Sequence, residues 1–101
     1  MENKYSVKLL PRAYRDLDGI YTYIAETPME SGIAVKLVES LGESIFSLES
    51  IPQRGALRKT GAYANKGYRQ LFVDNFTVAF RVEETKKRVL VVTVRYSKSR
   101  F

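Results

Sequence analysis

The residues of this sequence that are best suited to chemistry are its lysines and arginines, which gather in two stretches without acidic residues. Arg54–Arg69 holds five basic residues and Lys86–Arg100 holds six. Guanidinium and ammonium groups bind phosphate oxygens, so these stretches predict an anionic partner. A purely solubilising surface is the alternative, although such surfaces usually mix both signs. The residues expected to bind the partner are Arg54, Arg58, Lys59, Lys66, Arg95 and Arg100.

The absence of cysteine and histidine excludes much catalytic chemistry. Without cysteine the chain has no disulfide, no thiolate metal site and no thiol nucleophile. Without histidine it lacks the usual general base at neutral pH and most zinc sites. Its eleven carboxylates show no metal-ligand spacing, so we expect neither a metal nor a cofactor.

The net charge of +6 is divided unevenly along the chain. Residues 1–50 carry five Lys or Arg and eight Asp or Glu, whereas residues 51–101 carry twelve and three. An acidic half beside a basic half produces an oriented field, which again favours an anionic partner. Tyr63 and Tyr68 flank basic residues and are able to stack on bases, but we favour a packing role for both.

Two amphipathic helices are expected to position these residues. Pro11 suits the first turn of a helix, and apolar residues at three- and four-residue spacing extend that helix to about Glu26. After a break at Pro28, a second apolar stripe predicts a helix over about Met29–Glu49. So short a connection implies an antiparallel helical hairpin.

Residues 53–67, after the hairpin, have a loop-like sequence. Four strands are expected, one before the hairpin and three after this loop: Lys4–Leu10, Gly67–Val73, Phe76–Glu83 and Arg88–Arg95. Strict alternation in the third of these strands predicts Thr77 and Ala79 on its outer face. The last strand is apolar on both faces, with Leu90, Val92 and Val94 on one and Val89 and Val91 on the other. Such a strand belongs in the middle of a sheet.

The order β-α-α-β-β-β predicts an α+β fold, in which the helical hairpin packs on one face of a small, mostly antiparallel sheet. We expect the first and last strands to pair. At 101 residues the chain has the size of a single domain, residues 1–101. No apolar run approaches the ~20 residues of a membrane span, and the start of the chain has no signal-peptide character, so a soluble, cytoplasmic protein is expected.

This element order, chain length and charge placement resemble the RelE/ParE superfamily of bacterial toxins. Residues 16–25, DLDGIYTYIA, are similar to the first helix on the ParE side of the superfamily. The second helix ends in Ser47-Leu48 followed by Ile51-Pro52, and Tyr68-Arg69 and Val89–Arg95 resemble the closing strands. The resemblance implies the toxin of a type II toxin–antitoxin system, of the kind linked to plasmid stabilization, which arrests growth until an acidic antitoxin silences it.

The RelE side of the superfamily cuts mRNA on the ribosome through attack of a ribose 2′-hydroxyl on the adjacent phosphate. Such a site needs cations around the charged transition state and groups that transfer protons. The arginine that these enzymes carry early in the third strand falls on Thr77 here, which has no charge. The catalytic candidates that remain for a metal-independent endoribonuclease are Arg69, Arg81, Tyr96 and Lys98.

The ParE side instead traps DNA gyrase on cleaved DNA and needs a binding surface without catalytic residues. The helix sequence favours this action, and ribosome-dependent RNA cleavage is the alternative. A non-toxic nucleic-acid-binding module, or a degenerate toxin, is a third interpretation. The resemblance implies an acidic antitoxin as partner, gyrase or the ribosome with mRNA as target, and a homodimer or a toxin–antitoxin heterotetramer as possible assemblies. Tyr14, Tyr21 and Tyr23 are interpreted as packing residues or antitoxin contacts.

Overall fold

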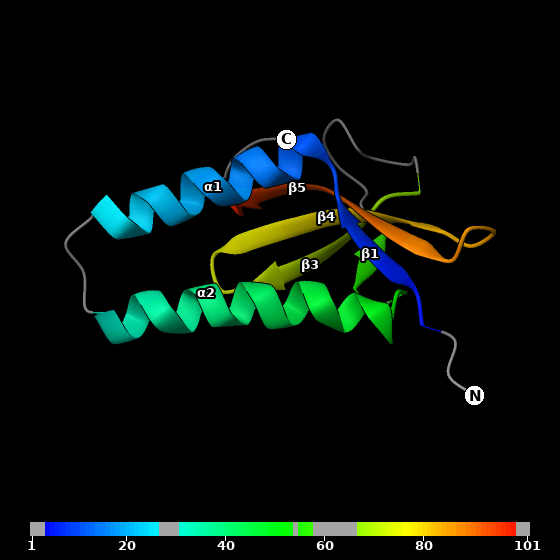
Figure 1. Ribbon diagram of the computed structural model, residues 1–101, viewed down its shortest axis with the longest axis horizontal. Coiled ribbons are helices and arrows are strands. Elements are labelled where there is room, and N and C mark those ends of the chain that lie inside the picture. Colours follow the sequence, from blue (N-terminus) through cyan, green and yellow to red (C-terminus); the bar gives the residue numbers. More distant parts are fainter. Residues whose placement is uncertain (1–3, 27–30, 54, 58–66, 99–101) are drawn as a thin grey trace.

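The computed structural model describes residues 4–26, 31–53, 55–57 and 67–98. In chain order its elements are β1 (Ser6–Leu9), α1 (Pro11–Glu26), α2 (Ser31–Phe46), a 3₁₀ turn η1 (Ser47–Glu49), β2 (Ala56–Leu57), β3 (Arg69–Val73), β4 (Phe76–Glu83) and β5 (Arg88–Tyr96). The two helices run antiparallel on the same side of the sheet (Figure 1). The expected α+β architecture is therefore confirmed, with the addition of the two-residue strand β2.

The sheet has the strand order β1-β5-β4-β3-β2. β1 pairs with β5 in parallel, with Val7 opposite Val89, and the other three pairings are antiparallel. The expectation that the first and last strands pair is thus confirmed. β5 lies between β1 and β4, which explains why both of its faces carry apolar residues.

Helix α1 begins at Pro11, whose missing N–H is not needed in a first helical turn. At the start of the helix the Tyr14 amide donates a hydrogen bond to the Leu10 carbonyl at 3.1 Å. Ala13 and Leu17 are buried, one turn apart, and the helix packs mainly against β5. The predicted end of this helix at Glu26 is confirmed.

Helix α2 packs mainly against β3 and η1 through Leu41 and Ile45, which are both buried. It ends at Phe46 rather than Glu49, because the chain tightens into a 3₁₀ turn at Ser47. The Ser47 hydroxyl donates to the Ser44 carbonyl at 2.6 Å, which offers the backbone an alternative to further α-helix.

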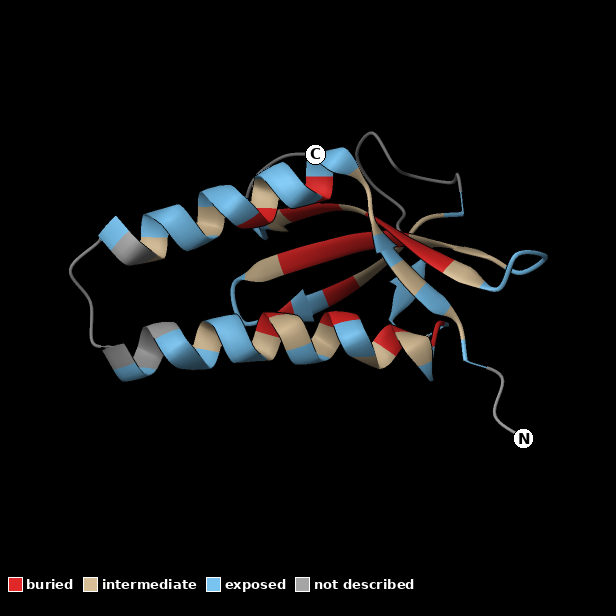
Figure 2. Ribbon diagram, viewed as in Figure 1, coloured by how far each residue is buried: buried red, intermediate tan, exposed pale blue. Residues whose placement is uncertain are grey.

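The core lies between the helices and the inner face of the sheet (Figure 2). Its centre consists of Val78 and Phe80 from β4 and Val89 and Val91 from β5, all without solvent exposure. Aliphatic side chains removed from water in this way supply most of the driving force for folding.

The alternation of β4 predicted that its outer face would be exposed to solvent, but part of that face is buried. Thr77 and Ala79 lie on that face as expected, but they are only 2% and 0% exposed. Ala79 is flanked by Gln70 and Thr93 on the neighbouring strands, so a small side chain is enclosed there by larger ones.

A β-bulge in β5 overturns one expected grouping of its apolar residues. Ala79 pairs with Thr93 but Phe80 pairs with Val91, so Val92 has no partner on β4. This extra residue reverses the alternation beyond it. Val94 therefore joins Val89 and Val91 in the core, instead of sharing a face with Leu90.

Three segments meet at the end of the sheet where the β4–β5 hairpin projects (Figure 1). The Tyr5 hydroxyl donates to Glu84 Oε1 at 2.5 Å, and Gln53 Nε2 donates to Glu84 Oε2 at 2.5 Å. The hydrogen bond to Glu84 raises the pKa of the Tyr5 hydroxyl, because it favours the protonated form. These bonds connect the start of β1 and the segment after η1 to the hairpin turn.

Candidate functional site

The face of the sheet that the helices leave uncovered carries four of the five Lys and Arg residues found in the described strands. Strand pairing places Lys8 beside Leu90 and Leu90 beside Arg81, so these three form one row across the sheet. Arg88 lies in the next row and Arg95 lies toward the other end of β5. We call Lys8, Arg81, Arg88 and Arg95 the basic face.

One carboxylate contacts both Arg81 and Arg88, and one aromatic ring lies against Arg81. The Arg81 guanidinium lies 5.9 Å from the centre of the Tyr68 ring and 3.3 Å from Glu83. Arg88 Nε donates to the same carboxylate of Glu83. That hydrogen bond, aided by the neighbouring positive charges, lowers the pKa of Glu83 below its ordinary value of 4.5. A single carboxylate between two arginines leaves this part of the face positively charged.

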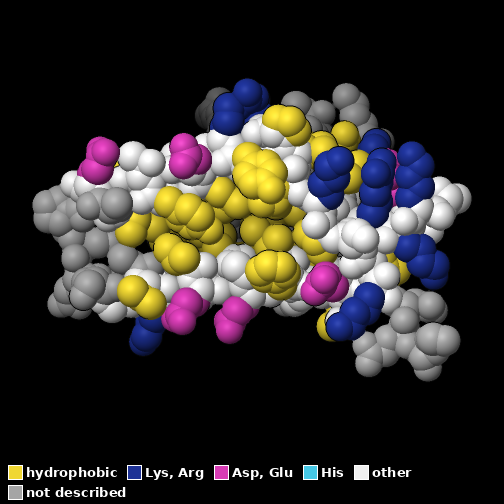
Figure 3. Space-filling model, in the orientation of Figure 1, with side chains coloured by type: hydrophobic (Ala, Val, Ile, Leu, Met, Phe, Trp, Pro, Cys, Tyr) yellow, Lys and Arg dark blue, Asp and Glu magenta, His cyan; other side chains and the backbone are white. Residues whose placement is uncertain are grey.

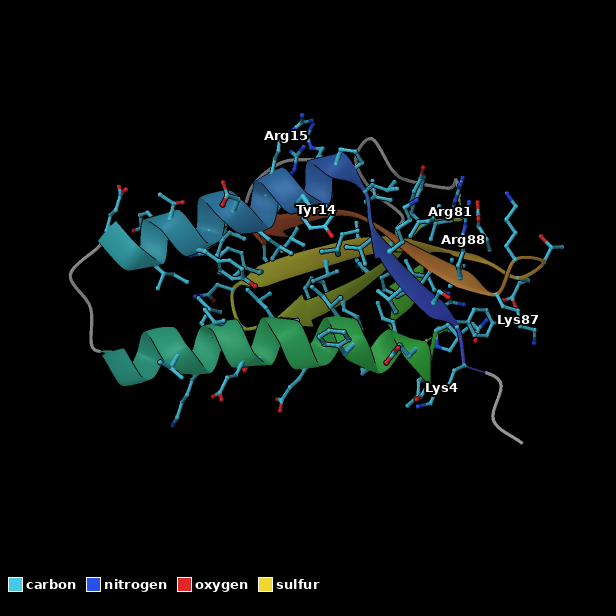
Figure 4. The ribbon with its side chains drawn as sticks, in the orientation of Figure 1. Lys4, Tyr14, Arg15, Arg81, Lys87 and Arg88 are labelled. Carbon is cyan, nitrogen blue, oxygen red and sulfur yellow. The ribbon has the colours of Figure 1, made fainter. Side chains whose placement is uncertain are left out.

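Basic side chains also lie close together around the hairpin formed by β4 and β5. Arg81, Arg88 and Lys87 lie at the same end of the molecule (Figure 4). The space-filling view shows a cluster of Lys and Arg over that end (Figure 3). Such a concentration of one sign attracts an extended polyanion or an acidic protein surface.

Arg95 occupies the far end of the basic face. Arg95 pairs with Thr77, which lies four positions from Arg81 along β4, and this corresponds to about 13 Å along the strand. Arg95 Nε donates to the Thr93 hydroxyl at 3.3 Å, and the Thr77 and Ser97 hydroxyls share a hydrogen bond of 2.8 Å. The face therefore presents positive charge at two separated positions.

The four catalytic candidates are not brought together. Arg69 pairs with Phe80 on the helix side of the sheet, where its guanidinium donates to the carbonyls of Gln53 and Gly55 at 3.0 and 3.3 Å. Tyr96 also lies on the helix side, with its ring centre 6.0 Å from that of Phe76. The remaining two are Arg81 on the basic face and Lys98, exposed beyond the end of β5.

The structure describes only one of the six binding residues expected from the sequence. Arg95 is described and lies on the basic face. The others lie outside the described residues: Arg54, Arg58, Lys59, Lys66 and Arg100.

An apolar groove separates the two helices, on the side of the sheet opposite the basic face. Its volume is about 650 Å³. α1 contributes Ile20, Tyr23 and Ile24 to its wall, α2 contributes Leu37, and Phe76 and Tyr96 come from the sheet. Figure 3 shows hydrophobic side chains along this strip between the helices. Tyr23 is 64% exposed and Tyr96 is 44% exposed, so neither is fully used in packing.

Sequence reasoning missed Lys8, Arg88 and the groove. Strand patterns could have placed both basic residues on the outer face. Lys8 alternates with the apolar Val7 and Leu9, and Arg88 pairs across the hairpin with Glu83. The same rule places Arg69 on the helix side, because Leu71 is buried two residues along the strand. The groove has no such signal, because it depends on the distance between the two helices.

Two kinds of site are not found in the described part of the chain. No group of three or more Asp or Glu residues is placed so that it could hold a metal ion. No described helix is long and apolar enough to cross a membrane.

Solved structures of toxins share this fold. The chromosomal ParDE toxin–antitoxin system from P. aeruginosa superposes with a TM-score of 0.70 and 25% identity, over 96% of this chain and 100% of the other. The toxin–antitoxin complex RelBE2 from Mycobacterium tuberculosis gives 0.62 and 18%, over 92% and 98%. The YoeB/ParE toxin from Agrobacterium tumefaciens gives 0.60 and 18%, over 90% and 96%. The fold is therefore that of the RelE/ParE toxins.

The sequence narrows this class to a family. A family model described as the ParE toxin of the type II toxin–antitoxin system parDE matches residues 7–101. No curated protein matches the sequence. Because the family model spans nearly the whole chain, this protein belongs to the ParE family of type II toxins, as the resemblance in the sequence implied.

Proposed function

We propose that this toxin arrests growth by binding DNA gyrase and not by cutting RNA. The observation that carries the proposal is the division of the catalytic candidates between two faces of the sheet, with Arg69 and Tyr96 on the helix side and Arg81 on the other. Cleavage by a 2′-hydroxyl needs proton-transfer groups and charge-stabilising groups within hydrogen-bonding distance of one phosphate. A set divided in this way supports an inhibitor that acts through its surface.

The basic face supplies a surface suited to such a target. Arg81 and Arg88 contact a single carboxylate, Lys8 lies in the same row of the sheet as Arg81, and Arg95 adds a second positive position about 13 Å away. Separated positive positions on a sheet suit an extended anionic surface, such as a protein–DNA complex, better than they suit a single reacting phosphate.

The apolar groove supports a second part of the proposal, which is silencing by an antitoxin. Exposed aromatic and aliphatic side chains in a groove between two helices suit the apolar face of an amphipathic segment. The similar ParDE and RelBE2 structures are toxin–antitoxin systems or complexes, in agreement with a partner of this kind. We expect the antitoxin to occupy this groove.

A test in cells separates the two modes of action. The toxin is induced briefly in a bacterium while DNA and protein synthesis are followed by pulse labelling and messages are mapped. The expected result is an early halt in DNA synthesis with double-strand breaks and intact messages. An early halt in protein synthesis with cut messages would overturn the proposal in favour of a ribosome-dependent nuclease.

A second test uses purified components. Gyrase, supercoiled plasmid and toxin are mixed, and the protein is then removed with detergent and protease. We expect linear DNA that depends on both gyrase and toxin, and at least a tenfold loss with Arg81→Ala combined with Arg95→Ala. Lys36→Ala, on the exposed surface of α2, is the matched control that should leave the yield unchanged.

A further inference from the structure

Asp16 lies at a gap along the edge of the sheet. β1 ends at Leu9, opposite Val91, so the following residues of β5 have no strand partner on that side. α1 fills the gap, and Asp16 Oδ2 accepts a hydrogen bond from the Val94 amide at 3.1 Å. This carboxylate thereby satisfies a backbone donor that would otherwise be unpaired at the end of the β1–β5 ladder.

The same carboxylate oxygen accepts a hydrogen bond from the Thr93 hydroxyl, and Thr93 in turn accepts a hydrogen bond from Arg95 Nε at 3.3 Å. A hydroxyl has one proton to donate and two lone pairs with which to accept, so donation to Asp16 leaves an acceptor for Arg95. Thr93 has no solvent exposure, so water does not compete for its hydroxyl. The three residues form one directed chain from α1 to the basic face.

We propose that Asp16 is a positioning residue for target binding, because it orients the Thr93 hydroxyl and thereby holds the Arg95 guanidinium on the basic face. The inference rests on the proposed function, in which Arg95 contacts the target. The bulge at Val92 makes the arrangement possible, since it brings Thr93 and Arg95 to the same face as Arg81. Asp16 also lines the apolar groove, so one residue contacts the groove directly and the basic face through Thr93.

A spectroscopic test addresses the positioning directly. Arginine Nε–Hε signals are recorded in ¹⁵N-labelled protein for the wild type, Asp16→Asn, Thr93→Val and Thr93→Ser. We expect Thr93→Val to shift the Arg95 signal and to raise its hydrogen exchange with water up to about tenfold, as expected for one lost hydrogen bond. Asp16→Asn should shift the same signal less, because the amide oxygen still accepts, and Thr93→Ser should restore it.

Asp18→Asn is the matched control, since Asp18 is exposed on α1 two residues from Asp16. It should leave the Arg95 signal unchanged. An Arg95 signal that is identical in the wild type, Asp16→Asn and Thr93→Val would overturn the positioning role, whatever the target of the toxin.

A double-mutant cycle tests whether positioning serves the target. Thr93→Val and Arg95→Ala should each lower gyrase-dependent DNA cleavage about tenfold, and the double variant should be no weaker than Arg95→Ala alone. If Thr93 had only a structural role, the double variant would show a lower DNA cleavage yield than Arg95→Ala alone, because the two losses would add. Full activity of Arg95→Ala would show that the target does not use this arginine, whereas the spectroscopic result would still report on Asp16 separately.

Discussion

Single residues on the basic face determine how its charge responds to pH. Glu83 lies between Arg81 and Arg88, with the Arg81 guanidinium at 3.3 Å. Its hydrogen bond with Arg88 favours the ionised carboxylate, which is why the pKa of Glu83 is lowered. The pair therefore stabilises the fold only while Glu83 is ionised, and a change in pH acts on this contact before it acts on the arginines.

The pH dependence of unfolding tests this contact. Because the folded-state pKa of Glu83 lies below the ordinary value of 4.5, its contribution is present above that value and is lost as the pH falls through the folded-state pKa. The difference in urea-unfolding free energy between the wild type and Glu83→Gln should be constant near neutral pH and shrink below about 4.5. Glu43→Gln, on the exposed surface of α2, is the control. A Glu83 difference that persists unchanged at pH 3 would contradict the assignment.

Two glycines with the same backbone conformation allow a second test at this scale. Gly55 and Gly67 have φ angles of +84° and +82°. A Cβ at Gly55 would lie 2.2 Å from the Gln70 carbonyl oxygen, whereas a Cβ at Gly67 meets nothing within 4 Å. Gly67→Ala should cost about 1–2 kcal/mol of unfolding free energy from backbone strain alone. Gly55→Ala should cost about 3 kcal/mol or more, because β3 must also move. Equal losses in urea titrations would show that the contact relaxes freely.

Among the elements, β5 has the greatest influence on the site. It pairs with both β1 and β4, it supplies half of the centre of the core, and its bulge moves Arg95 to the basic face. If the same residues formed a regular strand without a bulge, alternation would direct Thr93 and Arg95 toward the helices and Val94 away from them. The element therefore couples core packing to the placement of the charged residues.

The bulge residue itself should not be needed to place Arg95 on the basic face. Val92→Ala changes a half-buried residue and should cost about 1 kcal/mol. Deletion of Val92 would put Thr93 directly after Val91, so β5 would pair with β4 as a regular strand, and Thr93 and Arg95 would stay on the basic face. We therefore expect both variants to keep a cooperative thermal unfolding transition, followed by circular dichroism. Loss of that transition in the deletion variant would mean that the fold requires the bulge.

Over the whole molecule, the apolar groove and the basic face lie on opposite sides of the sheet. A toxin arranged in this way has separate surfaces for the proposed antitoxin and the proposed target. The two proposed activities should therefore respond to different substitutions, except at Asp16, which lines the groove and is linked to the basic face through Thr93.

Growth assays with and without a co-expressed antitoxin test this separation. Tyr23→Glu should keep growth arrest but weaken silencing by tenfold or more, because a charge replaces an exposed aromatic residue in the groove. Arg81→Glu should lose growth arrest by a similar factor while antitoxin binding persists. Loss of both properties in either variant, with the fold verified by circular dichroism, would mean that the surfaces overlap.

Local periodicity in the sequence was sufficient to predict the order and most boundaries of the elements. The 3.6-residue spacing of α1 and the alternation of β4 each lie within one segment, so their bounds at Glu26 and Glu83 were predicted without knowledge of the fold. The apolar character of both faces of β5 was also sufficient to place it inside the sheet. The sequence by itself determined the fold class, the absence of thiol and imidazole chemistry, and the strong positive charge.

Only the tertiary structure decided which charged residues share a face and where apolar surface stays exposed. A single unpaired residue, Val92, reverses the alternation of β5, and its unpaired position depends on pairing with β4. Asp16 meets Thr93 because β1 is too short to cover the edge of β5, which is a relation between residues far apart in the chain. The groove depends on α1 packing against β5 while α2 packs against β3. Contacts of this kind arise from register and packing between distant segments, so no local pattern in the sequence records them.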